Sequence, residues 1–194
     1  MDESAPFDQR YPNWSRLGRM IEDVSAAVDA LQADAQVDPK RIYVLGYAMG
    51  GDVALHAAAL DPDIQGVVSI AGFTPMRSNT LETGTGGLAL NSKFYNLSPR
   101  LGLFVGNEGR VPYDYDELIA AMAPRPVMIV SPQLARDANP KDVHDAVKAA
   151  RQVYTLYGAA DCLRLAEPWD YTRLPTTTQN EAIKWLTDVS AHNE

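Results

Sequence analysis

Residues 41–71 read RIYVLGYAMGGDVALHAAALDPDIQGVVSIA and hold two short apolar runs on either side of a helical pattern. The run at 41–45 is rich in β-forming residues and ends at Gly46, which predicts a buried strand. A pair of glycines then opens a predicted helix over about 49–60, and the second run, 64–71, predicts another buried strand. A strand, a helix and a strand within about 30 residues indicate a right-handed βαβ unit and therefore a parallel sheet.

The same alternation continues on both sides of this unit. Hydrophobic spacing predicts a helix over about 15–33, a short helix at 115–122, a strand at 127–130, a helix from Pro140 to about Tyr157, a strand at 163–166 and a helix at 178–190. Residues 1–13 are predicted to be an irregular lead-in, and 73–115 a loop excursion with a short helix near 91–97. The prediction is an α/β fold, a mostly parallel sheet flanked by helices, in a single domain over 1–194.

Composition excludes several classes of protein. The 194 residues are 46% hydrophobic and 22% charged, which is typical of one globular domain. A net charge of −8 disfavours binding to nucleic acid or to an anionic membrane. The single cysteine, Cys162, excludes an internal disulfide and a cysteine-cluster metal site. No apolar run is long enough to span a bilayer, and the first residues lack the apolar core of a signal peptide, so a cytoplasmic location is the default expectation.

The turn Gly46-Tyr47-Ala48-Met49-Gly50 carries the most specific local pattern. A sharp strand-to-helix turn needs small residues two positions either side of its apex, and in the G-x-S-x-G nucleophile elbow the apex is a serine. Here the apex is Ala48, whose methyl group cannot attack an ester. The alternative interpretation is an ordinary tight turn of a Rossmann-like fold.

The residues flanking this turn carry a family resemblance. The stretch VDPKRIYVLGYAMGGDVALHAAALD at 37–61 resembles the elbow region of an α/β-hydrolase, of the branch that includes dienelactone-hydrolase-like and acetyl-xylan-esterase-like enzymes. APRPVMIV at 123–130 is similar to a later strand of that family, and RDANP at 136–140 to its acid loop. The similarity covers about 14 to 190. It implies hydrolysis of a small or carbohydrate carboxylic ester, with no cofactor and no metal.

The resemblance assigns roles to individual residues. Ala48 takes the nucleophile position, the Met49 N–H is one oxyanion donor, and Asp137 is the acid that would orient a histidine. Asp142 is a weaker candidate, because an acid in the first turn of a helix usually complements the helix dipole. Trp169 and Tyr171 are candidates for stacking on the substrate, or equally for closing the end of the sheet.

The chain departs from the family pattern at the histidine. The segment after the last predicted strand, 167–173, contains none, and Trp169 stands where one is expected. His56 follows the elbow on its helix, His144 lies in the helix after Asp137, and His192 is near the end of the chain. None of the three supports a catalytic assignment. A cluster of carboxylates, Asp114, Asp116 and Glu117, is interpreted as a helix start.

The predicted strands number about four, against eight in a complete α/β-hydrolase sheet. The chain is therefore expected to correspond to the C-terminal half of that fold, without its N-terminal strands, and to leave a sheet edge that needs a partner. A second copy of the chain and a complementary segment are the two candidates. Three functions stay open: an ester hydrolase made inactive by Ala48, a pseudoenzyme that keeps its pocket for a ligand or partner, and an interaction module.

Overall fold

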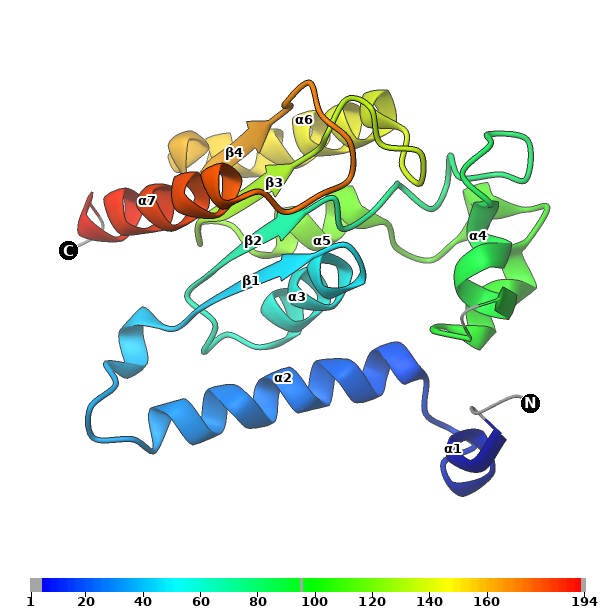
Figure 1. The fold of residues 1–194 in the computed structure, drawn as a ribbon, viewed down its shortest axis with the longest axis horizontal. Helices are drawn as coiled ribbons and strands as arrows, with labels where there is room; N and C mark the ends of the chain where they lie inside the picture. Colours follow the sequence, from blue (N-terminus) through cyan, green and yellow to red (C-terminus); the bar gives the residue numbers. More distant parts are fainter. Residues whose placement is uncertain (1–4, 95, 193–194) are drawn as a thin grey trace.

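A computed structural model describes residues 5–94 and 96–192. Its centre is a sheet of four parallel strands in the order β1-β2-β3-β4 (Figure 1). Their bounds are Tyr43–Tyr47, Gly66–Ile70, Val127–Val130 and Leu163–Ala166. Leu45 pairs with Val68, and Val68 with Met128, so the strands keep one register across the sheet. The parallel sheet predicted from the sequence is confirmed.

Helices cover the two faces of the sheet unequally. On one face α3 (Met49–Leu60), α5 (Tyr115–Ala121) and α6 (Pro140–Leu156) share a core with β2 and β3, and α2 (Arg16–Gln32) packs against α3 (Figure 1). On the other face α7 (Thr176–His192) is the helix that packs against the same strands in the described part of the chain. This division follows the side-chain alternation of a strand, because neighbouring residues point to opposite faces. Val67 and Ile129 belong to the first core, and Val68 and Met128 to the second.

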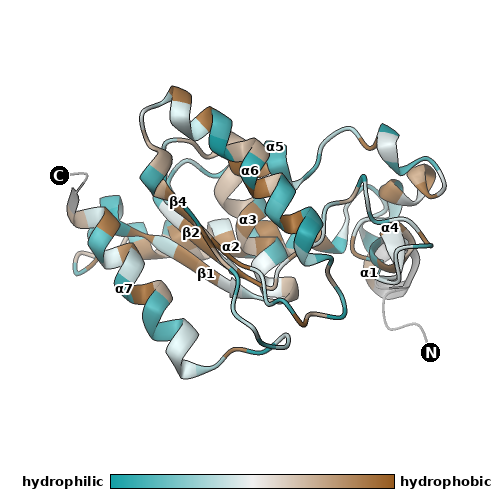
Figure 2. Cartoon of the chain, turned by 90° about the horizontal axis from the view of Figure 1, so that it is seen from above, coloured by the Kyte–Doolittle hydropathy of each residue, from teal (hydrophilic) through white to brown (hydrophobic). Residues whose placement is uncertain are grey.

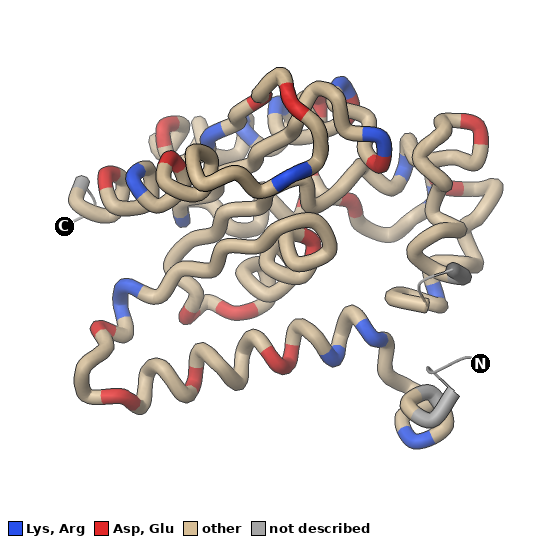
Figure 3. The backbone as a smooth tube through the Cα atoms, viewed as in Figure 1, with Lys and Arg blue, Asp and Glu red and all other residues tan. Residues whose placement is uncertain are grey.

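The distribution of polarity agrees with this layering. The strands and α3 are predominantly hydrophobic, whereas the outer helices alternate between apolar and polar faces (Figure 2). Charged residues lie on the surrounding helices and loops, and β1, β2 and β3 carry none (Figure 3). In the part of the chain that the structure describes, no helix has the length and apolar character required to cross a membrane.

Helix boundaries follow the expected capping chemistry. The Ser15 side chain accepts a hydrogen bond from the Gly18 N–H at 2.9 Å and starts α2. Asn139 accepts from the Lys141 N–H at 3.1 Å, and Pro140 occupies the first turn of α6. Both starts agree with the sequence predictions to within one residue.

Two aperiodic regions differ from their predictions. The lead-in contains a short helix, α1 (Ala5–Arg10). The ring centroid of Phe7, on this helix, lies 5.4 Å from that of Tyr11, which follows it. In the excursion, helical backbone begins before 91–97, with α4 (Gly87–Ala89) and a π-helical turn over Leu90–Phe94. Gly86 explains the early start, because its φ of 82° lets the chain reverse directly into the helix. Short 3₁₀ turns follow at Pro99–Phe104 and Glu108–Arg110.

Strand β1 lies at one side of the sheet. Among the described residues it pairs only with β2, and Leu45 on its α7 side is 38% exposed. The expected exposed edge is therefore present in the described part of the chain. Its predicted occupants, a second copy or a complementary segment, stay predictions.

Candidate active site

Ala48 occupies the apex of the turn between β1 and α3. Its φ of 50° and ψ of −125° belong to a region that favours glycine, so its backbone is strained. The Ala48 N–H donates to the Ile70 carbonyl at 2.9 Å, which ties the apex to the end of β2. Ala71, the next residue of that strand end, also has a positive φ, 49°, and donates to the Val130 carbonyl at 2.8 Å. Two strained alanines therefore lie at the carboxyl edge of the sheet.

The glycines around the apex explain how the turn closes. A Cβ on Gly46 would lie 2.0 Å from the Gly50 carbonyl oxygen, so only glycine fits there. A Cβ on Gly50 would meet nothing within 4 Å, so the prediction that packing requires a small residue at this position is wrong. The second glycine that packing requires is Gly51, where a Cβ would lie 2.9 Å from the Cα of Gly72.

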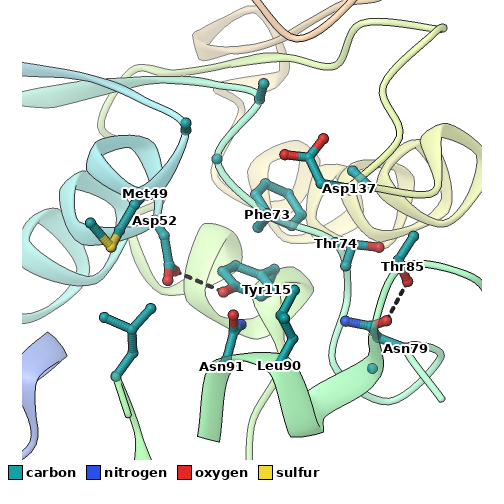
Figure 4. A pocket seen from close by; sticks show the side chains of 16 residues that line it. Met49, Asp52, Phe73, Thr74, Asn79, Thr85, Leu90, Asn91, Tyr115 and Asp137 are labelled. Carbon is teal, nitrogen blue, oxygen red and sulfur yellow. Dashed lines mark hydrogen bonds between the residues drawn. The ribbon is translucent and has the colours of Figure 1, made fainter. Parts of the chain in front are cut away.

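A cavity of about 340 Å³ opens beside the apex (Figure 4). The elbow, the loop after β2, the excursion, the start of α5 and the loop after β3 all contribute to its wall. The lining residues are Ala48, Met49, Asp52, Ala71, Gly72, Phe73, Thr74, Asn79, Thr85, Gly87, Leu90, Asn91, Leu97, Tyr115, Asp137 and Ala138. More than half of them belong to residues 73–115, so the aperiodic excursion forms most of the cavity wall.

The structure brings together three of the five residues predicted for the site. Ala48, Met49 and Asp137 line the cavity from separate segments. Met49 is the first residue of α3, so its N–H precedes the helical hydrogen bonds and remains suited to an oxyanion role. Trp169 and Tyr171 are 80% and 59% exposed and are not among the lining residues, so their substrate-binding role stays a prediction.

Asp137 has a hydroxyl partner. Its Oδ1 accepts a hydrogen bond from Thr172 Oγ1 at 3.0 Å. Two backbone bonds hold the same loops together, from Gln133 N–H to Pro168 O at 2.9 Å and from Leu134 N–H to Asp170 O at 3.0 Å. The loop after β4 therefore reaches Asp137, and Thr172 is the residue of that loop that contacts its carboxylate. The role of Asp137 as the acid of a triad stays a prediction.

The histidines whose side chains the structure describes lie elsewhere. His144 is on α6, with its Nδ1 3.3 Å from the carboxylate oxygens of Glu167. His56 is buried on α3 and belongs to a second cluster. Neither lines the cavity. His192 ends α7, and its side chain lies outside what the structure describes.

Asp52, His56, Tyr113 and Tyr115 form a buried polar cluster below the apex. Asp52 Oδ1 accepts a hydrogen bond from the Tyr115 hydroxyl at 2.7 Å and lies 3.1 Å from His56 Nδ1. His56 Nε2 is 3.1 Å from the Tyr113 hydroxyl. Asp52 and Tyr115 line the cavity, as Figure 4 shows. The sequence analysis did not identify this cluster, because an acid in a first helical turn and a distant tyrosine share no local pattern.

The cluster shifts the pKa values of its members. Burial alone would lower the pKa of His56, but the hydrogen bond with Asp52 and the charge of that carboxylate raise it above 6.5. Burial raises the pKa of Tyr115 well above 10, and the neighbouring Asp52 charge adds to the effect. Protonated His56 therefore stabilises the folded chain, whereas both tyrosines keep their protons.

We expect this cluster to make stability depend on pH. Because the folded pKa of His56 is raised, its contribution is complete below about pH 6.5 and is lost as the pH rises through the folded value. The free energy of unfolding should therefore fall as the pH rises above about 6.5, and less so in a His56→Gln variant. Urea denaturation at several pH values measures this, with the exposed His144→Gln as the matched control. An unchanged pH slope in His56→Gln would contradict the assignment.

The carboxylates at the end of the excursion and in the first turn of α5 serve as a helix start. Asp114 is buried and begins α5 through a capping box with Glu117. Its two oxygens also accept the Met76 and Arg77 N–H groups, each at 2.8 Å, and so fix the beginning of the excursion to α5. The interpretation of these acids as a helix start is confirmed. The Asp114 carboxylate is therefore one of the contacts that hold the excursion in place as part of the cavity wall.

Comparison with known proteins agrees with this geometry. Residues 14–158 match the family described as "Glucuronyl esterase, fungi". The carbohydrate esterase MZ0003, from an unknown prokaryotic organism, is 28% identical over 168 residues, which cover 83% of this chain and 39% of that protein. This chain therefore spans about two-fifths of that relative.

Solved structures share the fold. A glucuronoyl esterase from Solibacter usitatus superposes with a TM-score of 0.78 at 21% identity, covering 90% of this chain and 49% of that one. A serine-to-alanine variant of the Sporotrichum thermophile glucuronoyl esterase, solved with methyl 4-O-methyl-β-D-glucopyranuronate, superposes with a TM-score of 0.71 at 21% identity, covering 89% and 50%. The parallel sheet flanked by helices thus has the α/β-hydrolase fold, and the chain belongs to the glucuronyl esterase family.

Proposed function

We propose that this chain binds a carbohydrate ester in the cavity beside Ala48 and leaves the ester bond intact. The observation that carries the proposal is the methyl group at the elbow apex. Ala48 keeps the strained backbone of the elbow and borders the cavity, yet offers no lone pair for attack on a carbonyl carbon. A binding site is retained, and acyl transfer through residue 48 is not available.

The surroundings of Asp137 support the same proposal. Acyl transfer needs a histidine between the acid and the nucleophile, to take the proton and return it to the leaving group. Asp137 accepts a hydrogen bond from the Thr172 hydroxyl, which is not basic enough near neutral pH to take a proton from a nucleophile as a histidine would. Neither His56 nor His144 lines the cavity. More than the nucleophile therefore differs from a working triad.

The family suggests the ligand. The Sporotrichum thermophile variant carries alanine in place of one serine and holds a methyl ester of a glucuronic acid. That example supports a sugar ester as the ligand of an alanine-bearing protein with this fold. For the present chain we propose esters of hexuronic acids, the class to which that compound belongs.

A second candidate is an ester hydrolase in which residue 48 is the altered position. Two features favour it: the Met49 N–H at the start of α3, and the place of Asp137 in the cavity wall. Under this alternative a serine at position 48 restores an activated nucleophile. The two candidates therefore differ in what one substitution does.

Binding without turnover is the expected result. Calorimetric titration with methyl glucuronate should give a dissociation constant in about the millimolar range or tighter, with no ester cleavage above the uncatalysed rate. An Ala48→Ser variant, shown to be folded, should bind the ester and remain unlabelled by a fluorophosphonate. Labelling at residue 48 would favour the hydrolase instead. Failure of the unaltered chain to bind any sugar ester would favour an interaction module.

A further inference from the structure

Asp52 places a fixed carboxylate in the cavity wall. It lies one turn along α3 from Ala48 and is only 7% exposed. The Tyr115 hydroxyl and His56 Nδ1 both contact Oδ1, at 2.7 and 3.1 Å. Oδ2 takes part in neither contact, so its lone pairs are available to a ligand. Asp52 therefore offers the cavity a hydrogen-bond acceptor whose orientation is fixed by its contacts with Tyr115 and His56.

The protonation of His56 follows from its neighbours. His56 Nδ1 lies 3.0 Å from the Asp52 carbonyl oxygen as well as 3.1 Å from Asp52 Oδ1. Both partners are acceptors, so Nδ1 carries a hydrogen. Tyr115 likewise donates its hydroxyl hydrogen. Two donors thus hold the carboxylate in place before any ligand arrives, which reduces the ordering cost of binding.

The charges in the cavity wall have one sign. Asp52 and Asp137 are its acidic members, and no lysine or arginine is among the lining residues in the described part of the chain. In a partly enclosed site, unpaired charges of the same sign repel more strongly than in open water. An anionic ligand would meet two carboxylates and no lining lysine or arginine, and His56, the partner of Asp52, lies behind that carboxylate and is not among the lining residues. A neutral ligand escapes this repulsion and can donate hydroxyl hydrogens to Asp52.

The remaining wall suits a neutral sugar. The rings of Phe73 and Tyr115 stack with centroids 4.2 Å apart, and Leu90 and Leu97 add apolar surface. Asn79 Oδ1 accepts a hydrogen bond from the Thr85 hydroxyl, so the amide nitrogen of Asn79 can still donate to a ligand (Figure 4). Apolar surface with a few fixed polar groups is the usual composition of a small-molecule site.

We propose that the cavity selects neutral hexuronate esters against the corresponding ionised sugar acids, and that Asp52 sets this preference. The inference rests on the proposed function, because it assumes that a sugar ester is the ligand. Cleavage of the ester would turn a neutral ligand into an anion at the same position. The site therefore distinguishes the esterified sugar from its hydrolysis product.

Three ligands that differ only at the C6 carbonyl group test the proposal: methyl glucuronate, glucuronamide and sodium glucuronate. Titration at about pH 8, where the acid is ionised, should show similar affinities for the ester and the amide, and an affinity at least about tenfold weaker for the acid. We call the ratio of the affinity for the ester to that for the acid the gap, and an Asp52→Asn variant should narrow it several-fold. Asp63→Asn, exposed beyond the far end of α3, removes one charge away from the cavity and should leave the gap unchanged.

A second measurement needs no substitution. Because salt screens charge repulsion, the gap in the unaltered chain should narrow as the salt concentration rises from about 0.01 M to 0.5 M. Equal affinity for the ester and the acid would overturn the proposal while leaving the proposed function in place. A gap that persists in folded Asp52→Asn would overturn the role of Asp52. Failure of all three ligands to bind would overturn the proposed function itself.

Discussion

A Gly46→Ala variant is expected to lose at least about 3 kcal/mol of its free energy of unfolding. The added Cβ would lie 2.0 Å from the Gly50 carbonyl oxygen and 2.6 Å from the Gly51 nitrogen. These atoms belong to the first turn of α3, so the helix must shift to make room. A shift of α3 moves Ala48 and the cavity wall together. Urea denaturation measures the loss, and calorimetric titration measures the accompanying loss of ligand binding.

Gly50→Ala is the matched control for this prediction. The same Cβ is added four residues later, where nothing lies within 4 Å. Since alanine favours helix over glycine, this variant should equal the unaltered chain in stability or exceed it by up to about 1 kcal/mol. Similar losses in both variants would show that the turn does not pack as described.

Removing the Asp114 side chain is expected to cost about 3 kcal/mol. In Asp114→Ala the N–H groups of Met76, Arg77 and Tyr115 lose a charged acceptor at the same time. Two of these groups begin the excursion, and the third begins α5. The excursion should therefore lose its position beside the cavity, and ligand binding should weaken together with stability. Thermal unfolding and calorimetric titration of the same preparation measure the two effects.

Asp116→Ala separates this role from a general effect of acids in the first turn. Burial raises the pKa of Asp116, and the charge of neighbouring Glu117 adds to the effect, so the folded chain slightly disfavours the ionised form. Its removal should change stability by less than about 1 kcal/mol. If Asp114→Ala proves as mild as Asp116→Ala, the Asp114 carboxylate does not hold the excursion in place.

The regular elements could be predicted because their hydrophobic period is local. Helix α3 and strand β3 have the predicted bounds, since an apolar run between turn residues has few alternative interpretations. β1 begins two residues later than predicted, at Tyr43, because Pro39–Arg41 forms a 3₁₀ turn that Asp38 caps. That turn depends on one side chain, and hydrophobic spacing does not reveal it.

The cavity wall could be predicted only in part. Ala48, Met49 and Asp137 follow strands, and the ends of parallel strands meet at one edge of a sheet. Asn79 lies within the excursion and Tyr115 at its end. The sequence there has no hydrophobic period from which the direction of a side chain could be predicted. Their position depends on contacts between residues far apart in the chain, such as the bond from Met76 N–H to Asp114.

The cavity joins two parts of the chain that differ in how much substitution their backbone geometry permits. Its floor, at Ala48 and Ala71, is fixed by strained backbone and by glycines that tolerate no side chain, so most substitutions there damage the whole fold. The wall from residues 73–115 is one continuous segment between β2 and α5, which anchors such as Asp114 hold in place and which contributes no residue to the strand register. Substitutions on the cavity side of this segment can therefore change ligand preference while the strained turns that carry the cavity floor stay intact.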